Sequence, residues 1–577
     1  MGAIKGFKLA EPYDPPHQAQ LKFIMEGELA ETLDNERTLI TRAKLTNYRV
    51  TGEPEFIVTT PQCVRNNTNE LINSPGRLRV ETADGRFSIE GEGFLWREAN
   101  SSLVISNRVH TVIEAGLLDP EHPGSTNRSS NGGAGEVHVY SDHFTYDSEP
   151  GLGIYSGNVH VSGTNRDLAM TSGLLRVKLP AQERQLHTIT AETNVVIDYS
   201  GLHATGDRAD YWVSNAIARI TGHPTWRAAP REGSGDELVI DRTNKFFQAN
   251  GNAWMKMPGA SLGPTTFMLG TNTAVPSSPA AATNQFVEVW SERYEFHTNW
   301  GVFRDHVRVV ERRGGEEFRQ MTCGLLTVTL AGSNELQTLV ADGDVVIDQE
   351  TNRLAGGRAV YTATNGMLEL TRKPYWRAGP REGRGDKLQI WRDQMLVSGN
   401  AMMRLPASEL AESVSSGTNQ PRSRPAAAQL AEIYSQDYTL RTNRAVFRGG
   451  IYATHPQMNL ACERLEVELG TGGGKIVTAE QGVAFDLKDE HDQSMHGAGD
   501  KAIYTVRRAG NITNDVLRLI GNPALVQTSN TVGTASVLLL NRATGELVAP
   551  NGDYRIQGTG PSFGSNTFVL PKPKISK

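Results

Sequence analysis

The stretch that decides the fold runs Trp226-Arg-Ala-Ala-Pro-Arg-Glu-Gly-Ser-Gly-Asp236, and it returns almost letter for letter as Trp376-Arg-Ala-Gly-Pro-Arg-Glu-Gly-Arg-Gly-Asp386. Segments around it return at the same spacing, as in Asn194-Val-Val-Ile-Asp198 and Asp344-Val-Val-Ile-Asp348. A chain that copies a unit of about 150 residues usually builds a stack or an array of equivalent units.

The composition favours some classes of protein and excludes others. The chain has 577 residues, of which 38% are hydrophobic and 58 are glycine, with a mean hydropathy of −0.40. Such values are ordinary for a protein made of many short strands and turns. The net charge is −6, and 58 basic residues are well mixed with 64 acidic ones, so the sequence shows no nucleic-acid footprint. No apolar run is long enough to span a bilayer.

Branched side chains recur with a period of two in short segments such as Gly157-Asn-Val-His-Val161 and Val307-Arg-Val309. Such alternation indicates short strands with one apolar face. Turn dipeptides, among them Asp84-Gly85 and Asn551-Gly552, interrupt these segments along the chain, and helical periodicity is nearly absent. The sequence therefore predicts an all-β chain. A sandwich, a barrel and an open roll fit the pattern, whereas a propeller blade is too short for the repeat.

Three stretches rich in small residues and proline bury little apolar surface and indicate linkers, at residues 115–135, 259–284 and 407–429. Between them we expect four repeats, at residues 17–114, 136–258, 285–406 and 430–568. Repeats two and three are close copies, repeat four keeps the frame loosely, and repeat one is the most diverged.

Repeat two carries an ordered series of short motifs. The series is Ser141-Asp-His-Phe-Thr-Tyr-Asp147, Tyr155-Ser-Gly-Asn-Val-His-Val161, Ala191-Glu-Thr-Asn-Val-Val-Ile197, Ala204-Thr-Gly-Asp-Arg-Ala-Asp-Tyr211 and Ile220-Thr-Gly-His-Pro224. Repeat three contains the series again, and repeat four contains a looser version. This order resembles the OstA-like (LptA-type) domain of the lipopolysaccharide-transport bridge. Repeat one resembles the related LptC-type domain.

The resemblance implies an open β-jellyroll, or β-taco: two sheets folded into a V whose apolar interior holds lipopolysaccharide acyl chains. Tandem repeats would stack, strand edge to strand edge, into an elongated grooved rod. It implies a non-enzymatic, cofactor-free bridge in the periplasm that shields the lipid on its way to the outer membrane. The implied partners are lipopolysaccharide or a related lipid, an inner-membrane transport complex and outer-membrane translocon components. The alternative function is a β scaffold or spacer in envelope assembly that binds no ligand.

The periplasmic location rests on the resemblance. The segment Met1–Pro12 lacks the uninterrupted apolar stretch of a signal peptide, which indicates either a protein that stays inside the cell or a processed form.

Inward-facing positions of the repeated strands are the candidates for a lipid groove. We expect the groove to be lined by Val159, Val161, Val195, Ile197, Ala209, Tyr211, Val307, Val309, Val345, Ile347, Ala359, Tyr361 and Tyr504. The alternative for each side chain is ordinary core packing. Small interior side chains would favour the conduit, and large aromatic ones would favour the scaffold.

Two arginine pairs belong to the repeated element, Arg227 with Arg231 and Arg377 with Arg381. Arginine forks match phosphate and carboxylate oxygens, so these side chains would contact lipid phosphates if they lie at the rim of a groove. The favoured alternative is an edge hairpin in which tryptophan packs, Pro-Arg-Glu-Gly turns and aspartate accepts backbone hydrogen bonds.

No catalytic residue is predicted. Gly259-Ala-Ser-Leu-Gly263 matches a nucleophile-elbow string, but it lies in a linker with no helix after it. Gly470-Thr-Gly-Gly-Gly-Lys475 is one residue short of a phosphate-binding loop, and Ile476 stands where that loop needs a hydroxyl. A carbohydrate-active β-solenoid enzyme is a third hypothesis, and the long repeat argues against it.

No metal site is predicted either, because no histidines or cysteines fall at ligand spacing. The cluster around His491 (Asp489, Glu490 and Asp492) has no apolar surroundings and indicates a solvated loop. The three cysteines, Cys63, Cys323 and Cys462, are too few and too scattered for a disulfide framework. Cys323 and Cys462 have the same sequence context, and we expect small core-facing residues in corresponding strands.

Overall fold

The computed structural model describes residues 3–114, 135–148, 150–164, 168–178, 186–258, 285–331, 335–391, 394–407, 430–456, 458–469, 474–488, 494–509, 512–529, 531–541 and 546–558. The predicted linkers lie almost wholly outside these ranges. The string Gly259–Gly263, the cluster around His491 and most of Gly470–Lys475 also lie outside the described residues.

The chain divides into two compact units, which are described separately. Unit 1 comprises Met1–Met257 with Trp290–Gly301, and unit 2 comprises Pro258–Val289 with Val302–Lys577. The points of division lie at the end of β18 (Phe246–Pro258) and within β19 (Gln285–Phe296) and β20 (Trp300–Arg313).

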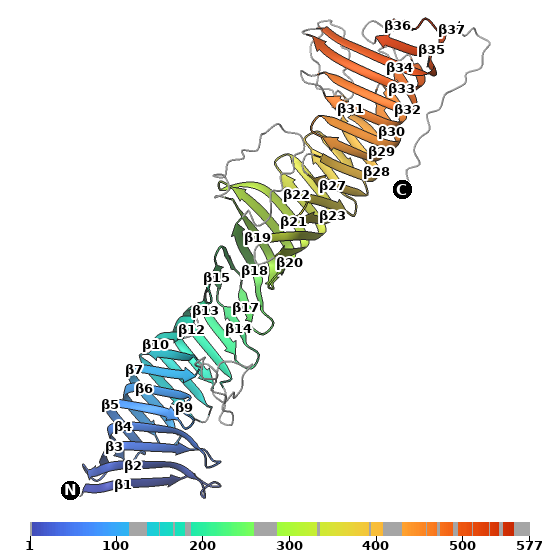
Figure 1. Cartoon of the computed structure of the whole chain (residues 1–577). Helices are drawn as coiled ribbons and strands as arrows, with labels where there is room; N and C mark the ends of the chain where they lie inside the picture. The colour runs from blue at the N-terminus through green and yellow to red at the C-terminus, as the bar shows by residue number, and fades with distance from the viewer. Residues whose placement is uncertain are drawn as a thin grey trace. The chain divides into compact units, whose positions relative to one another are not determined.

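The other strands of unit 1 follow one another along the chain (Figure 1). They are β1 (Ala3–Pro12), β2 (Leu21–Thr32), β3 (Arg37–Tyr48), β4 (Pro54–Asn66), β5 (Leu71–Thr82), β6 (Phe87–Arg97), β7 (Ser102–Glu114), β8 (Glu136–Ser141), β9 (His143–Asp147), β10 (Leu152–Gly163), β11 (Leu168–Lys178), β12 (Thr188–Tyr199), β13 (Leu202–Trp212), β14 (Ile217–Thr221), β15 (Thr225–Ala228), β16 (Arg231–Ser234), β17 (Glu237–Asp241) and β18 (Phe246–Pro258).

Unit 2 is likewise built of strands that follow one another along the chain. Its other strands are β21 (Glu316–Ala331), β22 (Glu335–Gln349), β23 (Asn352–Thr362), β24 (Met367–Thr371), β25 (Tyr375–Ala378), β26 (Arg381–Arg384), β27 (Lys387–Trp391), β28 (Gln394–Pro406), β29 (Leu430–Arg441), β30 (Arg444–His455), β31 (Met458–Leu469), β32 (Lys475–Lys488), β33 (Ser494–Ala509), β34 (Ile512–Gln527), β35 (Thr531–Asn541), β36 (Glu546–Val548) and β37 (Arg555–Gly558).

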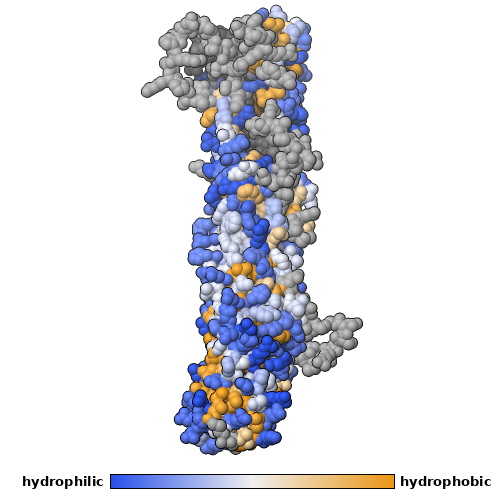
Figure 2. All heavy atoms as spheres, turned by 90° about the vertical axis from the view of Figure 1, so that its left-hand side faces the viewer, coloured by the Kyte–Doolittle hydropathy of each residue, from blue (hydrophilic) through white to orange (hydrophobic). Residues whose placement is uncertain are grey.

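The all-β prediction is confirmed. Consecutive strands pair antiparallel, as β10 does with β11 and β22 does with β23, and the described residues contain no α-helix. Burial alternates with a period of two, so that Phe23 and Met25 of β2 point inward while Lys22 and Glu26 point outward. The surface on view is mainly hydrophilic, with apolar surface gathered near the N-terminal end (Figure 2).

A corner in the middle of each long strand explains the Gly-Asn-Val motif. In β10 the pairing with β11 shifts between Ser156 and Val159, and both intervening residues take left-handed φ values, 78° at Gly157 and 46° at Asn158. Asn158 Nδ2 donates to Asp142 Oδ2 at 2.8 Å. A β-carbon on Gly157 would lie 2.5 Å from that carboxylate, so the corner needs glycine there.

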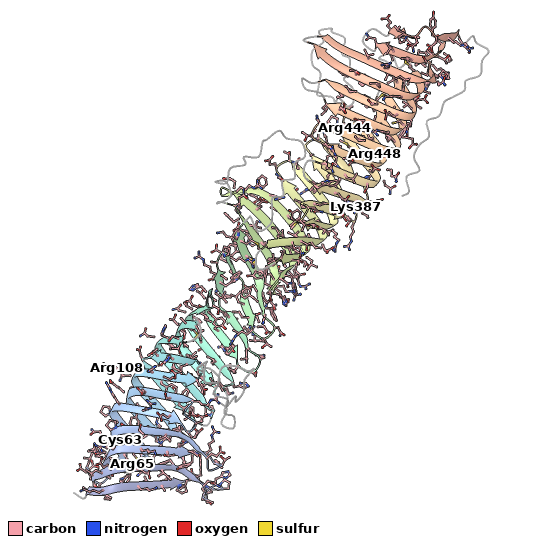
Figure 3. All side chains as sticks on the ribbon, viewed as in Figure 1. Cys63, Arg65, Arg108, Lys387, Arg444 and Arg448 are labelled. Atoms are coloured by element: carbon pink, nitrogen blue, oxygen red, sulfur yellow. The ribbon has the colours of Figure 1, made fainter. Side chains whose placement is uncertain are left out.

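The corner divides each strand into two arms, and inward side chains of the arms face each other. In β6, for example, Ile89 precedes the corner at Gly91–Gly93 and Trp96 follows it, and both are buried. The prediction for the cysteines is confirmed, since all three are buried and free, and burial raises the pKa of each thiol to about 12. Cys63 lies on β4 (Figure 3).

Strands pair across two of the predicted linkers. β7 pairs with β8 from Val109–Ser141 to Glu114–Glu136, and β28 pairs with β29 up to Pro406–Leu430. The division into four repeats stays a prediction; the contacts within the chain separate two units.

Candidate functional site

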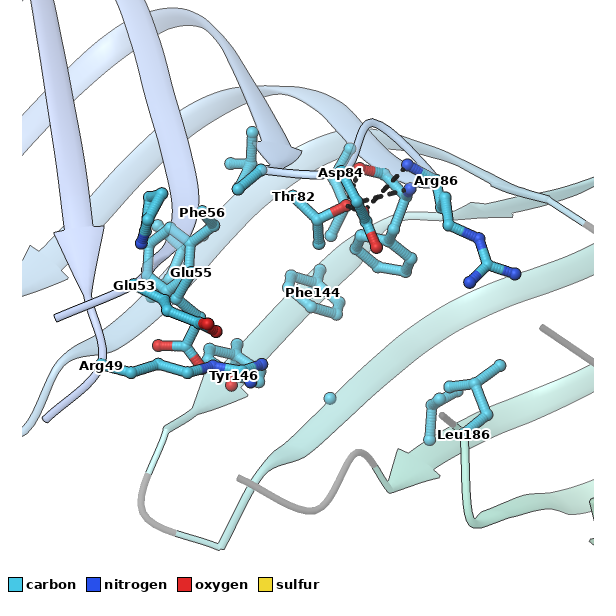
Figure 4. A pocket seen from close by; sticks show the side chains of 18 of the residues that line it. Arg49, Glu53, Glu55, Phe56, Thr82, Asp84, Arg86, Phe144, Tyr146 and Leu186 are labelled. Carbon is cyan, nitrogen blue, oxygen red and sulfur yellow. Dashed lines mark hydrogen bonds and ion pairs between the residues drawn. The ribbon is translucent and has the colours of Figure 1, made fainter. Parts of the chain in front are cut away.

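A cleft of about 430 Å³ lies between the two arms of unit 1 (Figure 4). Strands β4, β5 and β6 line one arm through Phe56, Val80 and Ile89. Strands β7, β9, β10 and β11 line the other arm, where Phe144 and Tyr155 are the largest buried side chains. The cleft volume falls in the range of small-molecule sites, which are mostly apolar and concave.

Aromatic rings form the walls of the cleft. The ring of Phe56 meets that of Trp96 edge-on at 5.4 Å between centroids, and that of Tyr146 at 6.2 Å. Phe144 lies 4.7 Å from Tyr155. Burial raises the pKa of Tyr146 and of Tyr155, so both phenols are neutral at neutral pH. The interior is therefore uncharged and suited to hydrocarbon.

Charged side chains form the rim. Asn47 is 1% exposed, and its Nδ2 donates to Glu55 Oε2 at 2.9 Å. Arg49 Nε lies 3.8 Å from Glu55 Oε1. Burial raises the pKa of Glu55, which outweighs the opposite effects of Arg49 and of the Asn47 hydrogen bond. Across the cleft, Arg86 Nε donates to Glu114 Oε2 at 2.8 Å.

One polar atom of the cleft lining, Arg49 Nε, is buried without a hydrogen-bond partner among the described residues. Buried polar atoms in folded proteins are nearly always paired. A polar group on a ligand whose chain enters the cleft would supply an acceptor for Arg49 Nε.

The cleft exists because small and branched residues occupy the positions that large ones fill elsewhere. On one arm, Val80 pairs with Ile89, and Ile89 pairs with Thr111. On the facing arm, Ile105 pairs with Phe144. Thr111 is the third residue after the left-handed Arg108 at the corner of β7.

Counting three residues from the corner of the corresponding strand in unit 2 gives a position that pairs with the repeated element. Met403 is the third residue after the left-handed Asn400; it pairs with Gly383, and Gly383 pairs with Trp376. On the facing arm Val397 pairs with Tyr438, so Trp376 stands where unit 1 has Val80, and Tyr438 stands where it has Phe144.

Trp376 spans the interior at this point. Its Nε1 donates to the hydroxyl of Tyr438 at 2.7 Å, and both side chains are buried. Unit 1 contains the same pair once, with Trp226 Nε1 donating to the Tyr294 hydroxyl at 2.6 Å. Burial raises the pKa of both tyrosines. We call each Trp–Tyr pair a crossbar.

Glycine opposite the indole makes the crossbar possible. A β-carbon at Gly233 would lie 2.6 Å from Trp226 Nε1, and one at Gly383 would lie 2.5 Å from Trp376 Nε1. The last residue of the element has a separate role at a corner, where Asp386 accepts from Asn400 Nδ2 at 2.9 Å. The element is thus a hairpin that holds a crossbar, a role that sequence reasoning missed. A signal was present, because a strand, a turn and a strand place Gly233 opposite Trp226.

The prediction of a hairpin is confirmed, but the turn is at Ala229–Pro230, Arg231–Ser234 form strand β16, and the hairpin does not lie at an edge. β15 pairs with β13, and β16 pairs with β18, so the hairpin has neighbours on both sides. Arg227 and Arg377 are exposed, while Arg231 and Arg381 are half-buried, and burial lowers the pKa of Arg231. None of the four arginines lines the cleft of unit 1.

The thirteen groove candidates point inward to different degrees. Ten are buried: Val159, Val161, Val195, Ala209, Val307, Val309, Val345, Ile347, Ala359 and Tyr361. Ile197, Tyr211 and Tyr504 are half-buried. None of them lines the cleft, and Tyr504 lines a cavity of only about 50 Å³ in unit 2. Their contact with lipid stays a prediction.

Within the described ranges, no group of three or more histidine, cysteine or acidic side chains is placed to hold a metal ion. Among the same residues, no helix has the length and apolar character needed to cross a membrane.

A comparison with known protein families agrees with the resemblance seen in the sequence. The family described as LptA/(LptD N-terminal domain) LPS transport protein matches residues 138–246. No curated protein matches the chain. One similar solved structure is LptH of Pseudomonas aeruginosa, described as the LptA homologous periplasmic component of the lipopolysaccharide transport device. The two sequences are 17% identical over a match that covers 20% of this chain and 82% of LptH, and the TM-score is 0.18. Residues 138–246 are therefore similar to the LptA/LptD N-terminal family of lipopolysaccharide-transport proteins.

Proposed function

We propose that the chain takes part in lipopolysaccharide transport as a non-enzymatic carrier, and that the cleft of unit 1 shields an acyl chain of the lipid. The observation that carries this is the aromatic cleft of about 430 Å³, open at a charged rim. Each methylene that leaves water for such a site contributes about 0.8 kcal/mol. Arg49 Nε, which lines the cleft and has no hydrogen-bond partner among the described residues, would meet the polar head of the same lipid.

The periplasm is the proposed location, because the matched family is one of lipopolysaccharide transport. The proposed partners are the transport components on either side, joined by strand pairing. β1 offers an edge for this: it pairs with β2, and most of its side chains are exposed. An unpaired edge of a sheet is a template for a further strand.

The thirteen inward residues and the arginines of the two hairpins remain proposed contacts for lipid passing beyond the cleft. Passage past a crossbar requires the tryptophan and tyrosine to separate, because both are buried in contact with each other.

A scaffold is the second candidate function, and the crossbars favour it for the crossbar-containing parts. Interiors filled by Trp376, Tyr438 and Phe447 resemble an ordinary core. In this alternative the chain holds envelope components apart and binds no lipid.

Photo-crosslinking distinguishes the two functions. A benzophenone amino acid replaces Phe144, which is 3% exposed and lines the cleft. The matched control replaces Thr145, the next residue of β9, which is exposed. The purified chain is mixed with lipopolysaccharide and irradiated, and adducts are detected by blotting. We expect an adduct at Phe144 and none at Thr145.

A third probe at Ile347, 6% exposed in unit 2, tests whether lipid passes beyond the cleft. Adducts at Phe144 and Ile347 support a conduit, and adducts at Phe144 alone support a single binding site. A folded Phe144 variant without adduct, checked by its circular dichroism, rejects lipid shielding and leaves the scaffold.

A further inference from the structure

A basic groove of about 690 Å³ crosses strands β3 to β7 of unit 1, separate from the cleft. Its cationic side chains are Arg42 and Lys44 of β3, Arg77 and Arg79 of β5, and Arg108 of β7. Pro61 and Gly91 also line it and add no long side chain. Arg108 is labelled in Figure 3.

The groove carries an excess of positive charge, although the whole chain has a net charge of −6. Its lining holds five lysine or arginine residues against two carboxylates, Glu90 and Glu92, while Glu28 and Glu81 pair with Arg42 and Arg79 from beside it. Glu92 is shared, at 3.5 Å from Arg77 and 3.3 Å from Arg108. The side chains of these two arginines are 85% and 77% exposed, so their ion pairs are weak.

Two of these arginines lie at strand corners. Arg42 and Arg108 take left-handed φ values of 49° and 53°. At corners such as Asn158 and Asn400 an asparagine takes that conformation, which suits its short side chain.

Apolar side chains run beside the groove on the outer face. Leu39 pairs with Val64 and Leu95 pairs with Val104, and all four are half-exposed. Each lies about three or four residues along its strand from the corner, roughly 10 Å away. Figure 2 shows apolar beside hydrophilic surface in this part of the chain. Beyond the other side of the corner, Tyr140 is 42% exposed and stacks on His110 at 4.5 Å.

We propose that this basic groove binds the phosphate groups of an anionic lipid surface. Cations recur on β3, β5 and β7, and alternate strands are about 10 Å apart, which presents a row of phosphate sites rather than one pocket. Exposed arginines flanked by an aromatic ring and by apolar side chains are the composition of a membrane-facing surface. The groove is distinct from the acyl-chain cleft, so this docking would hold even if the cleft bound nothing.

The test is sedimentation of the full chain with phosphatidylcholine vesicles that contain or lack phosphatidylglycerol. We expect binding only to the anionic vesicles, weakened by salt. The triple variant R42Q/R77Q/R108Q should bind at least tenfold more weakly, since each cation near an anionic surface changes affinity by about fivefold. The single variant E92Q should bind severalfold more tightly, a gain that misfolding cannot produce.

The matched control is R353Q/R372Q/R448Q, which removes three exposed arginines of unit 2 and changes the net charge equally. It should bind like the natural chain. Filling the cleft by Val80→Trp should also leave vesicle binding unchanged, which separates this docking from acyl-chain binding. Equal losses in both triple variants would overturn the proposal. So would no binding to anionic vesicles, the result expected if the groove docks an acidic protein segment.

Discussion

The cleft of unit 1 and the crossbar of unit 2 occupy equivalent strand positions. Val80, Ile89 and Phe144 face the cleft, and Trp376, Gly383 and Tyr438 stand at the corresponding places. The backbone pairing is alike in both, so whether this fold holds a space or a filled core depends on a few inward side chains. A cleft needs a branched residue opposite an aromatic ring, and a crossbar needs tryptophan beside glycine.

Removing a crossbar should have the largest effect. Trp376→Ala leaves a cavity and an unpaired Tyr438 hydroxyl, and we expect it to lower the free energy of unfolding by about 3–5 kcal/mol. Urea unfolding measures the loss, and hydrogen exchange in β25 to β29 should localise it to unit 2. The control Arg377→Ala changes the exposed neighbour and should stay within about 0.5 kcal/mol. Equal losses in both variants would show that Trp376 is not a crossbar.

Adding one methyl group opposite the indole should have the next largest effect on the free energy of unfolding. Gly383→Ala places a β-carbon against Trp376, and we expect a loss of about 2 kcal/mol in the free energy of unfolding. In a Trp376→Ala background the same change should cost less, because the indole is absent and only the Tyr438 hydroxyl still lies against the new β-carbon. The double-mutant cycle measures this coupling. Additive losses would mean that the glycine is needed for another reason.

Grafting a crossbar into the cleft tests the comparison directly. The variant V80W/I89G/F144Y reproduces the three residues of unit 2 at the positions that line the cleft. We expect it to fold and to lower the lipopolysaccharide adduct of a benzophenone placed at Tyr155 by about tenfold, equivalent to 1.4 kcal/mol. Val80→Leu, which keeps an aliphatic side chain, is the control. An unchanged adduct in the graft would mean that lipid reaches Tyr155 by another route.

The sequence predicts the class of fold well because its signals are local. Alternation over a few residues predicts the strands, and Gly157 with Asn158 marks a corner through the conformations these residues favour. The resemblance of residues 138–246 to the family is likewise carried by short motifs in order.

The cleft could not be predicted in the same way. Whether Val80 leaves a space depends on the size of Phe144 on the facing arm, 64 residues away along the chain. The groove residues predicted from the repeated motifs, such as Val345 and Ala359, are buried, whereas the diverged first repeat supplies most of the residues that line the cleft. Part of the crossbar could be predicted, since Trp226 and Gly233 recur together in the sequence. The tyrosine that pairs with Trp226, Tyr294, lies in the next repeat and could not be predicted in this way.

The smallest expected effect concerns the rim, where the cleft has a buried carboxyl and the crossbar has none. Burial raises the pKa of Glu55, so the folded chain holds this proton more tightly than the unfolded chain does. The resulting stability is fully present below the ordinary pKa of glutamate and is lost as pH rises through the raised value. Glu55→Gln should therefore be more stable than the natural chain by about 0.5 kcal/mol at neutral pH, with no difference below about pH 4. Urea unfolding across this range measures it. A variant less stable at neutral pH would show instead that the ion pair with Arg49 outweighs the cost of burial, and that the rim is held together before any lipid arrives.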